Sequence, residues 1–482
     1  MSLMSEHEAS SVMPGEVARR TSQQQLPSWR WEALRSTFWF VPTILVLVAG
    51  LSFLITLEID WAAYHKHLTL PFWIATGSAG AGREVLIAIV AAVITVVGVV
   101  FSITIVALTL ASQQFGPRMM RNFIRDVGNQ VTLGIFVSTF VYSILTLVAI
   151  TSDSHGTFVP HLSITVSEAL MLLDLAVLIY FIHHISRSIQ LPEVIAGIAR
   201  DLLRAIDAEL PEIGSDEPPL AREGEKPLSE VLSLLEQGGA PVAAIASGYL
   251  QFVGYAQLVT IADRTDSVIR LEHHPGHFIV AGRPLAVVWP PEAADQVANA
   301  LAKAHVIGPH RTLMQDPVFA IDQLVEIAIR ALSPAVNDTF TALTCIDWLS
   351  AGLSSVSKRT LVEGVYRGHE GQIRLIESDP SYARMVNRAF DKIRQAAPGM
   401  PAVLIRLIDA LAIIGSETAS PEQRRVLLRQ GEAILRSAER SVLEPNDQED
   451  LHSRYDRLIS KVTPAGRSPG SEEGSGPSGG GQ

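Results

Sequence analysis

Small and hydroxyl-bearing residues recur along one apolar stretch of the chain, Val85 to Ala111. They fall at intervals of three, four and seven residues, which places them on one face of a helix. The stripe contains Thr95, Gly98, Ser102 and Thr109, and Gln113 lies close to the same face just after the apolar stretch. Small residues let helices approach closely, so the stripe is either a helix-packing face or, if copies of the helix surround an axis, the lining of a water-filled pore. The sequence leaves both interpretations open.

The same helix is predicted to end where Gly116 and Pro117 follow it, because proline lacks an amide donor and restricts the residue before it. Two polar residues, Gln114 and Arg118, flank this end. If the stripe lines a pore, these two residues are expected at its cytoplasmic mouth.

Two carboxylates, Glu168 and Asp174, interrupt another apolar stretch, Leu162 to Ile182. A charge near the bilayer centre is costly, so such residues typically mark an ion path, a proton relay or a buried hydrogen bond between helices. Their separation of six residues turns them about 120° apart on a helix, so they do not form a pair on one face. Asp174 lies nearer the middle of the span and is the stronger candidate.

A third group of polar residues lies at positions 315–345. Its candidate residues for a cytoplasmic contact or ligand are Asp316, Arg330, Asn337 and Asp338. Glu326 and Arg330 have the spacing of a helical ion pair, and Asn337 or Asp338 suits the start of the following helix. Capping and ion pairing explain most of this segment, with a subunit contact or a small ligand as the alternative.

A glycine-rich run, Gly77–Glu84, resembles a phosphate-binding loop but fails as one. Arg83 and Glu84 occupy positions where that motif needs Lys and Ser or Thr, and no strand precedes the run. No metalloprotease helix or nucleophile elbow is visible either. We therefore expect no enzymatic activity and no cofactor.

The positions of the histidines and of the single cysteine do not indicate a metal site. His273, His274 and His277 lie beside a turn and are interpreted as structural, and His183–His184 follows an apolar stretch as an interfacial anchor. The single cysteine, Cys345, excludes a disulfide framework and a multi-cysteine metal site. It is expected to be a buried thiol rather than a nucleophile.

The composition indicates where these residues must reside. The chain has 482 residues, of which 48% are hydrophobic and only 18% charged. Soluble chains carry about a quarter charged residues, so the composition excludes a disordered protein and argues against a wholly soluble one. The formal net charge of −11 provides no attraction for nucleic acid.

Four apolar stretches are each long enough to cross a hydrocarbon core of about 30 Å as a helix. They are Phe38–Leu57, Val85–Ala111, Val131–Ile150 and Leu162–Ile182. Arginines cluster before the first stretch, between the second and third, and after the fourth, and none occurs at 151–161. The positive-inside rule therefore predicts both termini in the cytoplasm. We expect a multi-pass protein of the bacterial cytoplasmic (inner) membrane, with the lipid bilayer as its partner and no cleavable signal peptide.

The remainder of the chain is predicted to form a cytoplasmic α+β domain. Leu191–Leu210 and Ser229–Gln237 show helical periodicity, short strands follow, and helical periodicity returns from Glu292. The predicted organisation is a cytoplasmic tail (1–35), a four-helix transmembrane domain (36–185), connecting helices with an acidic Pro-rich loop (186–240), a small β-rich subdomain (241–291), a helical subdomain (292–463) and a disordered tail (464–482).

The β-rich subdomain is predicted from strands at Ile245–Val253, Val268–Leu271, Phe278–Val280 and Leu285–Trp289, interrupted by a helix at Tyr255–Arg264. Turn glycines bracketing short strands resemble half of a barrel-sandwich domain of the lipoyl or biotinyl type. Because no lysine lies between Lys226 and Lys303, the part cannot be an enzyme's carrier domain, and we interpret it as structural or as an interaction module.

These segments together resemble a bacterial family of predicted membrane proteins, domain of unknown function 2254. The resemblance covers roughly residues 31–441. Its strongest stretches are Phe101–Arg125, Gln130–Gly134, Phe158–Ser163, Tyr180–His184 and Gln315–Cys345. The resemblance implies class and location but no activity.

One turn departs from the similar sequences, which often read S-P-G-I-N-D-P. Here Ala335 replaces the glycine and Thr339 the last proline. Their loss weakens the case that this turn needs a special backbone conformation.

The function that these features favour is an oligomeric ion channel or transport-type protein, lined by the second membrane helix and regulated by the cytoplasmic domain. The alternative is a membrane-anchored scaffold or signalling receptor with no permeation path. A homo-oligomer is expected in the first case, with an ion or a small cytoplasmic ligand as a further partner.

Overall fold

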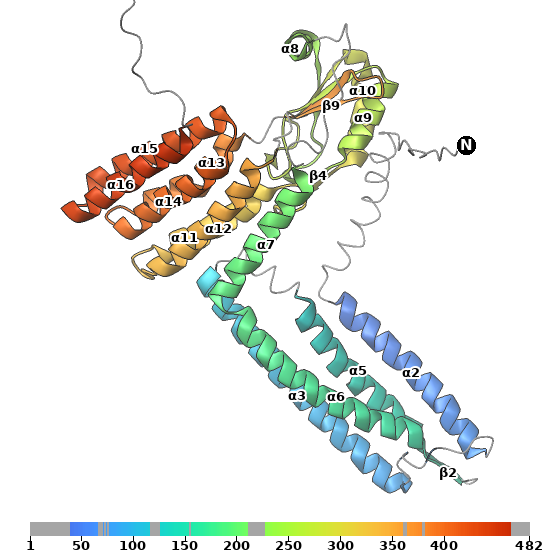
Figure 1. Ribbon diagram of the computed structural model, residues 1–482. Coiled ribbons are helices and arrows are strands. Elements are labelled where there is room, and N and C mark those ends of the chain that lie inside the picture. The colour runs from blue at the N-terminus through green and yellow to red at the C-terminus, as the bar shows by residue number, and fades with distance from the viewer. Residues whose placement is uncertain are drawn as a thin grey trace, which may run out of the picture. The chain divides into compact units, whose positions relative to one another are not determined.

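The computed structural model describes residues 39–65, 71, 74, 77–115, 126–153, 156–210, 227–359, 364–377 and 381–463. The chain divides into two compact units, Met1–Val194 and Ile195–Gln482 (Figure 1). The predicted tails at 1–35 and 464–482 and most of the predicted acidic loop lie outside the described residues.

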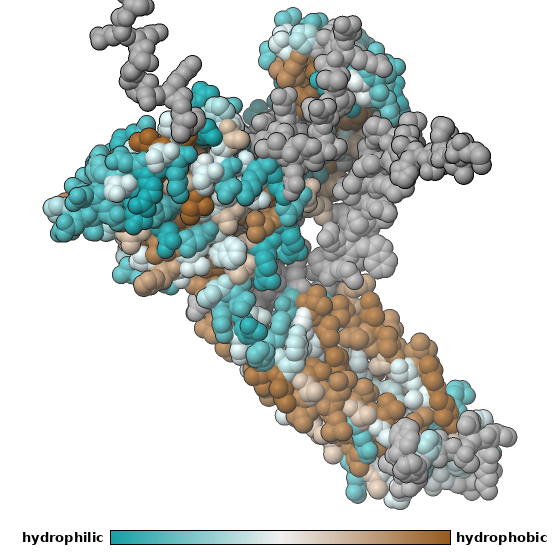
Figure 2. Space-filling view, in the orientation of Figure 1, coloured by the Kyte–Doolittle hydropathy of each residue, from teal (hydrophilic) through white to brown (hydrophobic). Residues whose placement is uncertain are grey.

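The first unit contains the four predicted membrane helices, each long and apolar enough to cross a membrane. They are α2 (Phe40–Tyr64), α3 (Ala79–Phe115), α5 (Val127–Ala149) and α6 (His161–Ser188), and a hairpin of β1 (Thr151–Asp153) and β2 (Gly156–Phe158) joins the last two. Most of the surface of the four-helix unit that is visible in Figure 2 is apolar, as expected for side chains that meet lipid. The glycine-rich run enters helix α3 at Ala79, so it does not form a phosphate-binding loop.

Helix α5 is the most buried of the four. Its most apolar 18-residue window is 44% buried, against 11% to 22% in the other helices, because α2, α3 and α6 all pack against it. Gly134 allows the close approach of α2: a Cβ at this position would lie 3.1 Å from Pro42 Cα and 2.5 Å from Leu45 Cδ1.

The division between the two units falls within α7 (Leu191–Glu209), which is followed by α8 (Leu228–Gly238). Both helices confirm the sequence prediction within one residue at each end. The buried face of α7 beyond Val194 contains Ile195, Ile198, Leu202 and Ile206, which have the three- and four-residue spacing that predicted it.

The second unit contains two sheets. The larger has the order β3-β7-β5-β10-β9 and the smaller β6-β4-β8, and the β5–β10 pair is parallel. The strands are β3 (Ala240–Ala243), β4 (Gly248–Val253), β5 (Val268–Leu271), β6 (Phe278–Ile279), β7 (Pro284–Trp289), β8 (His305–Gly308), β9 (Val365–Arg367) and β10 (Ile373–Glu377). All four predicted strands are confirmed, as is helix α9 (Tyr255–Arg264). Both sheets also recruit strands from beyond residue 291, which the local pattern did not reveal.

Helices make up the rest of this unit. They are α10 (Ala294–Ala304), which follows the 3-10 turn η1 (Pro291–Ala293), and α11 (Pro317–Ala331), α12 (Thr339–Ser357), α13 (Tyr382–Ala396), α14 (Pro401–Glu417), α15 (Pro421–Ser441) and α16 (Pro445–Val462). A mixed helical and sheet unit after four apolar helices is therefore confirmed. Helix α16 lies within the predicted helical subdomain (292–463), although the sequence pattern did not single it out as a separate helix.

The turn between α11 and α12 does contain a special backbone conformation, but not at Ala335, the position of the missing glycine. Asn337 has φ +51°, a left-handed conformation. Asparagine tolerates this region better than most residues other than glycine. Asp338 then caps α12 by accepting from Thr341 N at 3.1 Å, as predicted.

We predict that Gly134→Ala destabilises the four-helix unit by about 1–3 kcal/mol, because the added methyl must displace Leu45 and crowds the backbone of α2. Gly50→Ala on α2 is the matched control, since nothing lies within 4 Å of a Cβ there. Thermal unfolding in detergent measures both variants. Equal stability of the two would contradict the close approach of α2 and α5.

Candidate functional site

Asp174 lies in the interior of the four-helix unit, with only 6% of its surface exposed. Thr139 Oγ1 on α5 donates a hydrogen bond to Asp174 Oδ1 at 3.0 Å. The second oxygen, Oδ2, is buried and has no hydrogen-bond partner among the described residues. Asp174 thus makes a buried hydrogen bond between two helices, which is one of the roles that the sequence left open, and one half of the carboxyl group has no described partner.

Other polar side chains continue from Asp174 along the buried faces of α5 and α6. This polar seam consists of Thr139, Ser143 and Thr146 on α5 and Ser163, Ser167 and Asp174 on α6, all buried. Thr146 and Ser167 each donate to a carbonyl oxygen one turn earlier in their own helix. The Ser143 hydroxyl has no partner within the described part of the chain.

The seam ends at Asp60 on α2, a buried carboxylate that the sequence analysis missed. Asp60 Oδ1 accepts from Leu162 N at 2.8 Å, and Oδ2 accepts from Ser163 N at 2.9 Å and Ser163 Oγ at 2.7 Å. It therefore caps α6, where free amides and the helix dipole favour a negative charge. An acidic residue three positions after an apolar stretch was a usable signal, but the first span was predicted to end at Leu57 and so excluded Asp60.

Two more hydroxyls extend this end of the seam. Ser163 Oγ lies 3.1 Å from Thr56 Oγ1, which lies 2.7 Å from the Tyr142 hydroxyl. The chain of hydrogen bonds links α2, α5 and α6. Tyr142 also packs edge-on against Phe53, with ring centroids 6.0 Å apart.

On the other side of Asp174 the next buried side chains are apolar, and the buried polar residues Asn129, Gln130 and Thr132 of α5 follow about one to two turns beyond Phe136. Phe136 on α5 and Phe181 and Ile185 on α6 are at most 4% exposed and belong to one cluster with residues of α3. Past this layer, His184 Nε2 lies 2.8 Å from Asp126 Oδ1, and Asp126 caps α5. His184 thus has a specific partner in addition to the interfacial position predicted for it.

The predicted stripe on α3 lies on the outside of the four-helix unit. Thr95, Gly98, Ser102 and Thr109 are exposed, and a Cβ on Gly98 would meet nothing within 4 Å. Thr95 and Thr109 donate to carbonyl oxygens one turn earlier in α3. The stripe is therefore not packed against the chain's own helices.

Some predicted site residues are not brought together. Glu168 is half-buried on α6 and turned about 120° from Asp174. The side chains of Gln113 and Gln114, and all of Arg118, lie outside the described residues.

Asp316 caps the start of α11 by accepting from Phe319 N at 3.2 Å. Arg330, Asn337 and Asp338 lie about 20 Å away at the far end of the same helix. These four residues do not form one site.

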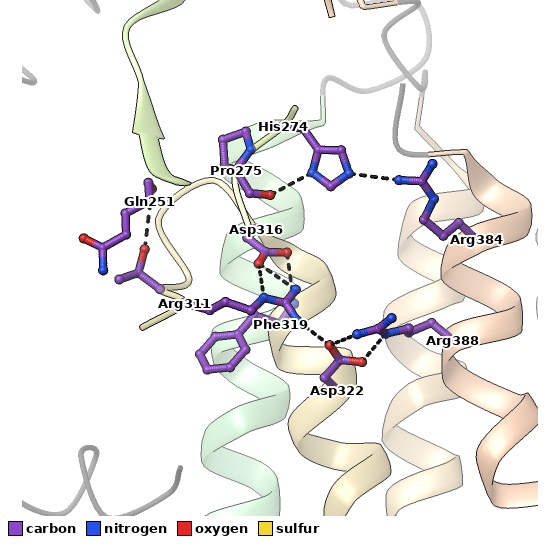
Figure 3. A network of polar contacts seen from close by, with 10 residues as sticks. Gln251, His274, Pro275, Arg311, Asp316, Phe319, Asp322, Arg384 and Arg388 are labelled. Atoms are coloured by element: carbon purple, nitrogen blue, oxygen red, sulfur yellow. Dashed lines mark hydrogen bonds and ion pairs between the residues drawn. The ribbon is translucent and has the colours of Figure 1, made fainter. Parts of the chain in front are cut away.

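Asp316 instead belongs to an ion-pair network that joins α11 to α13 (Figure 3). Arg311 donates to Asp316 Oδ2 through Nε at 2.8 Å and Nη2 at 2.7 Å, and Arg311 also pairs with Asp322. Asp322 pairs further with Arg388 on α13. Burial raises the pKa of Asp316 to about 6 despite Arg311. Burial opposes ionisation of Asp322 too, but Arg388 and Arg311 lower its pKa.

A cavity of about 90 Å³ lies beside this network in the second unit, lined in part by Glu209, Tyr255, Tyr366 and Glu377. The Tyr255 hydroxyl donates to Glu377 Oε1 at 2.6 Å, and the two tyrosine rings stack with centroids 4.9 Å apart. Burial and the adjacent charge of Glu377 raise the pKa of Glu209 to about 7. These residues come from distant parts of the chain, so the sequence alone gave no signal for the cavity.

Residues 35–413 match the family described as predicted membrane protein (DUF2254). The chain belongs to this family. Uncharacterized proteins of Mycobacterium tuberculosis H37Rv and of Mycobacterium bovis are each 34% identical to it over 379 residues, which cover 77% of this chain and 71% of theirs. No solved structure matches the chain.

The part of the chain that matches the DUF2254 family includes both candidate features. It contains all four membrane helices, with the polar seam, and the second unit as far as α14, with the ion-pair network and the cavity. Helices α15 and α16 lie outside the match. The predicted family and membrane class are thus confirmed, and function must be argued from the sites themselves.

We predict that Glu209→Gln removes a pH dependence from the stability of the second unit. The folded state raises the pKa of Glu209 from 4.5 to about 7, so the protonated form stabilises the fold. This contribution is complete below about 4.5 and is lost as the pH rises through 7.

Thermal unfolding on both sides of pH 7 measures the effect, with the exposed Glu236→Gln as control. The wild type and the control should lose stability on the alkaline side relative to Glu209→Gln. Parallel curves for all three would show that Glu209 titrates normally.

Proposed function

We propose that this protein is a homo-oligomeric ion channel or transport-type protein of the bacterial inner membrane, with α3 lining the path or the contact between copies. The four-helix unit is the membrane part, and the second unit is its regulatory domain in the cytoplasm. The proposal assigns no enzymatic activity to the chain.

The exposure of the α3 stripe is the observation that carries this proposal. Had Thr95, Ser102 and Thr109 packed between the chain's own helices, they would have supported a self-contained unit. They lie instead on its outer face, where a second copy of α3 can approach closely over Gly98. Backbone hydrogen bonds satisfy the hydroxyls of Thr95 and Thr109, so the face tolerates either lipid or water.

The cytoplasmic placement of both termini in this proposal rests on how arginine is distributed among the segments between the membrane helices. Arg19, Arg20, Arg30 and Arg35 precede α2, and no lysine or arginine lies at 151–161 between α5 and α6. In this orientation the cavity beside Glu209 faces the cytoplasm's pH and solutes, and a regulatory ion or small ligand would act there.

We predict that a cysteine at Asn122 is labelled only from the inside and a cysteine at Ser154 only from the outside. Both positions lie outside the described residues. The native Cys345 needs no removal, because it is fully buried and burial raises its pKa to about 12. Labelling of position 122 from outside would invert the proposed orientation.

Ser102 tests the role of the stripe, since it lies one heptad from both Thr95 and Thr109. If the stripe faces water in the oligomer, Ser102→Asp is expected to assemble and to change ion flux, while Ser102→Leu reduces flux. Native mass in detergent and liposome flux measure both variants. Loss of the oligomer in Ser102→Asp, with no flux in the wild type, would favour a scaffold or receptor.

A further inference from the structure

We propose that Asp174 is a proton-binding site inside the four-helix unit, entered through the polar seam from the Asp60 end and closed at the other end by the Phe136–Phe181 layer. Proton binding converts the carboxylate to a neutral carboxyl, with the proton on Oδ2 and no other bond made or broken. The site lies within one chain and does not depend on the contact proposed for α3.

The unpaired oxygen is the first observation. An isolated carboxylate in a low-dielectric interior costs several kcal/mol unless it is paired or protonated. Asp174 has one hydroxyl donor at Oδ1 and no described donor at Oδ2. A bound proton neutralises the charge at the oxygen that lacks a partner.

On the described parts of the four helices, the basic side chains lie near helix ends and not beside Asp174. Helix α5 carries no charged residue along its whole length, and on α3 the charged residues Arg83 and Glu84 occur only in the first turns. Arg83 is engaged at the carbonyl of Ile150 at 2.9 Å. The other charged groups on these helices are acidic Glu168 on α6 and Glu58 and Asp60 near the end of α2. The basic groups of α6 lie toward its ends: His161 in the first turn, His183 and His184 about two and a half turns beyond Asp174, and Arg187 in the last turn, where it pairs with Glu193 at 3.8 Å.

The small number of oxygen ligands at Asp174 favours a proton over a metal cation. Alkali and alkaline-earth cations need several oxygen ligands, whereas Asp174 and Thr139 supply one carboxylate and one hydroxyl. No group of three or more His, Cys, Asp or Glu residues suited to a metal occurs in the described part of the chain.

The seam provides access from one side. Its hydroxyls recur on α5 at Thr139, Ser143 and Thr146 and on α6 at Ser167 and Ser163, ending at the Asp60 cap. Ser143 is fully buried with a hydroxyl free of described partners. Buried polar groups of this kind are usually satisfied by water, and water is the proton carrier that the seam requires.

The opposite side is closed by apolar side chains. Phe136 is 0% and Phe181 1% exposed, and both pack with α3 residues such as Val100 and Ala107. An apolar layer excludes water and so interrupts proton transfer. Beyond it lies the His184–Asp126 pair, whose side chains are 25% and 28% exposed, so a proton from Asp174 reaches that end of the unit only if the layer opens.

Infrared spectroscopy of the purified protein tests the site directly, because a protonated buried carboxyl has its own C=O band. The wild type is expected to show a band that appears as the pH falls. Asp174→Asn should lose it, and the matched control Glu168→Gln should keep it. Thr139→Val should retain the band at a shifted frequency, because the Asp174 C=O group loses its hydrogen-bond donor. A shifted band in this variant shows that the protein is folded and that the band belongs to Asp174.

Proton flux into liposomes tests the layer. Phe181→Ala is expected to raise proton leak above the wild type, and Phe181→Ala with Asp174→Asn to return it to the wild-type level. A carboxyl band unchanged by Asp174→Asn, or equal leak in the single and double variants, overturns the proposal. The infrared result does not depend on oligomerisation. The Asp174 proposal can therefore be overturned while the α3 proposal stands, and the α3 proposal can be overturned while the Asp174 proposal stands.

Discussion

The cap that Asp60 places on α6 fixes the arrangement of the four-helix unit. Free amides at a helix start are costly where water is scarce, and a carboxylate satisfies them with charge of the favourable sign. Because Asp60 belongs to α2 and bonds Leu162 and Ser163, it locks the start of α6 to another helix. Asp174 lies eleven residues, about three turns, further along, on the same face as Ser163, and this places it level with Thr139.

In this arrangement polar side chains gather inside the four-helix unit, and apolar side chains cover its outside. Helix α5, packed by three neighbours, buries hydroxyl and amide groups, whereas the outward face of α3 presents small residues without internal partners. Close packing alone would be served by alanine or leucine on α5. Unpaired buried atoms at Asp174 and Ser143 are therefore costs that packing does not explain, which makes the interior of the unit the place where chemistry is expected.

In the second unit, buried arginines hold together segments that are distant in sequence. Arg374 on β10 is 7% exposed and binds Asp263 at 2.9 Å and Asp266 at 2.7 Å near the end of α9. Between α11 and α13 the link is Asp322 on α11, which pairs both with the half-buried Arg311 and with Arg388 on α13. Removing one partner of a buried pair is strongly destabilising, so these pairs stabilise the contacts between the segments that they join.

The sequence by itself determined the four spans, the helices α7 to α9, four strands and a cap on α12 by Asn337 or Asp338, because periodicity, span length and capping are local properties of the chain. It also identified Asp174 as the acid of interest. Only the tertiary structure decided that α3 turns its stripe outward, that Asp60 caps α6, and that β9 and β10 join the large sheet. These depend on contacts between residues up to about a hundred positions apart, which no local pattern encodes.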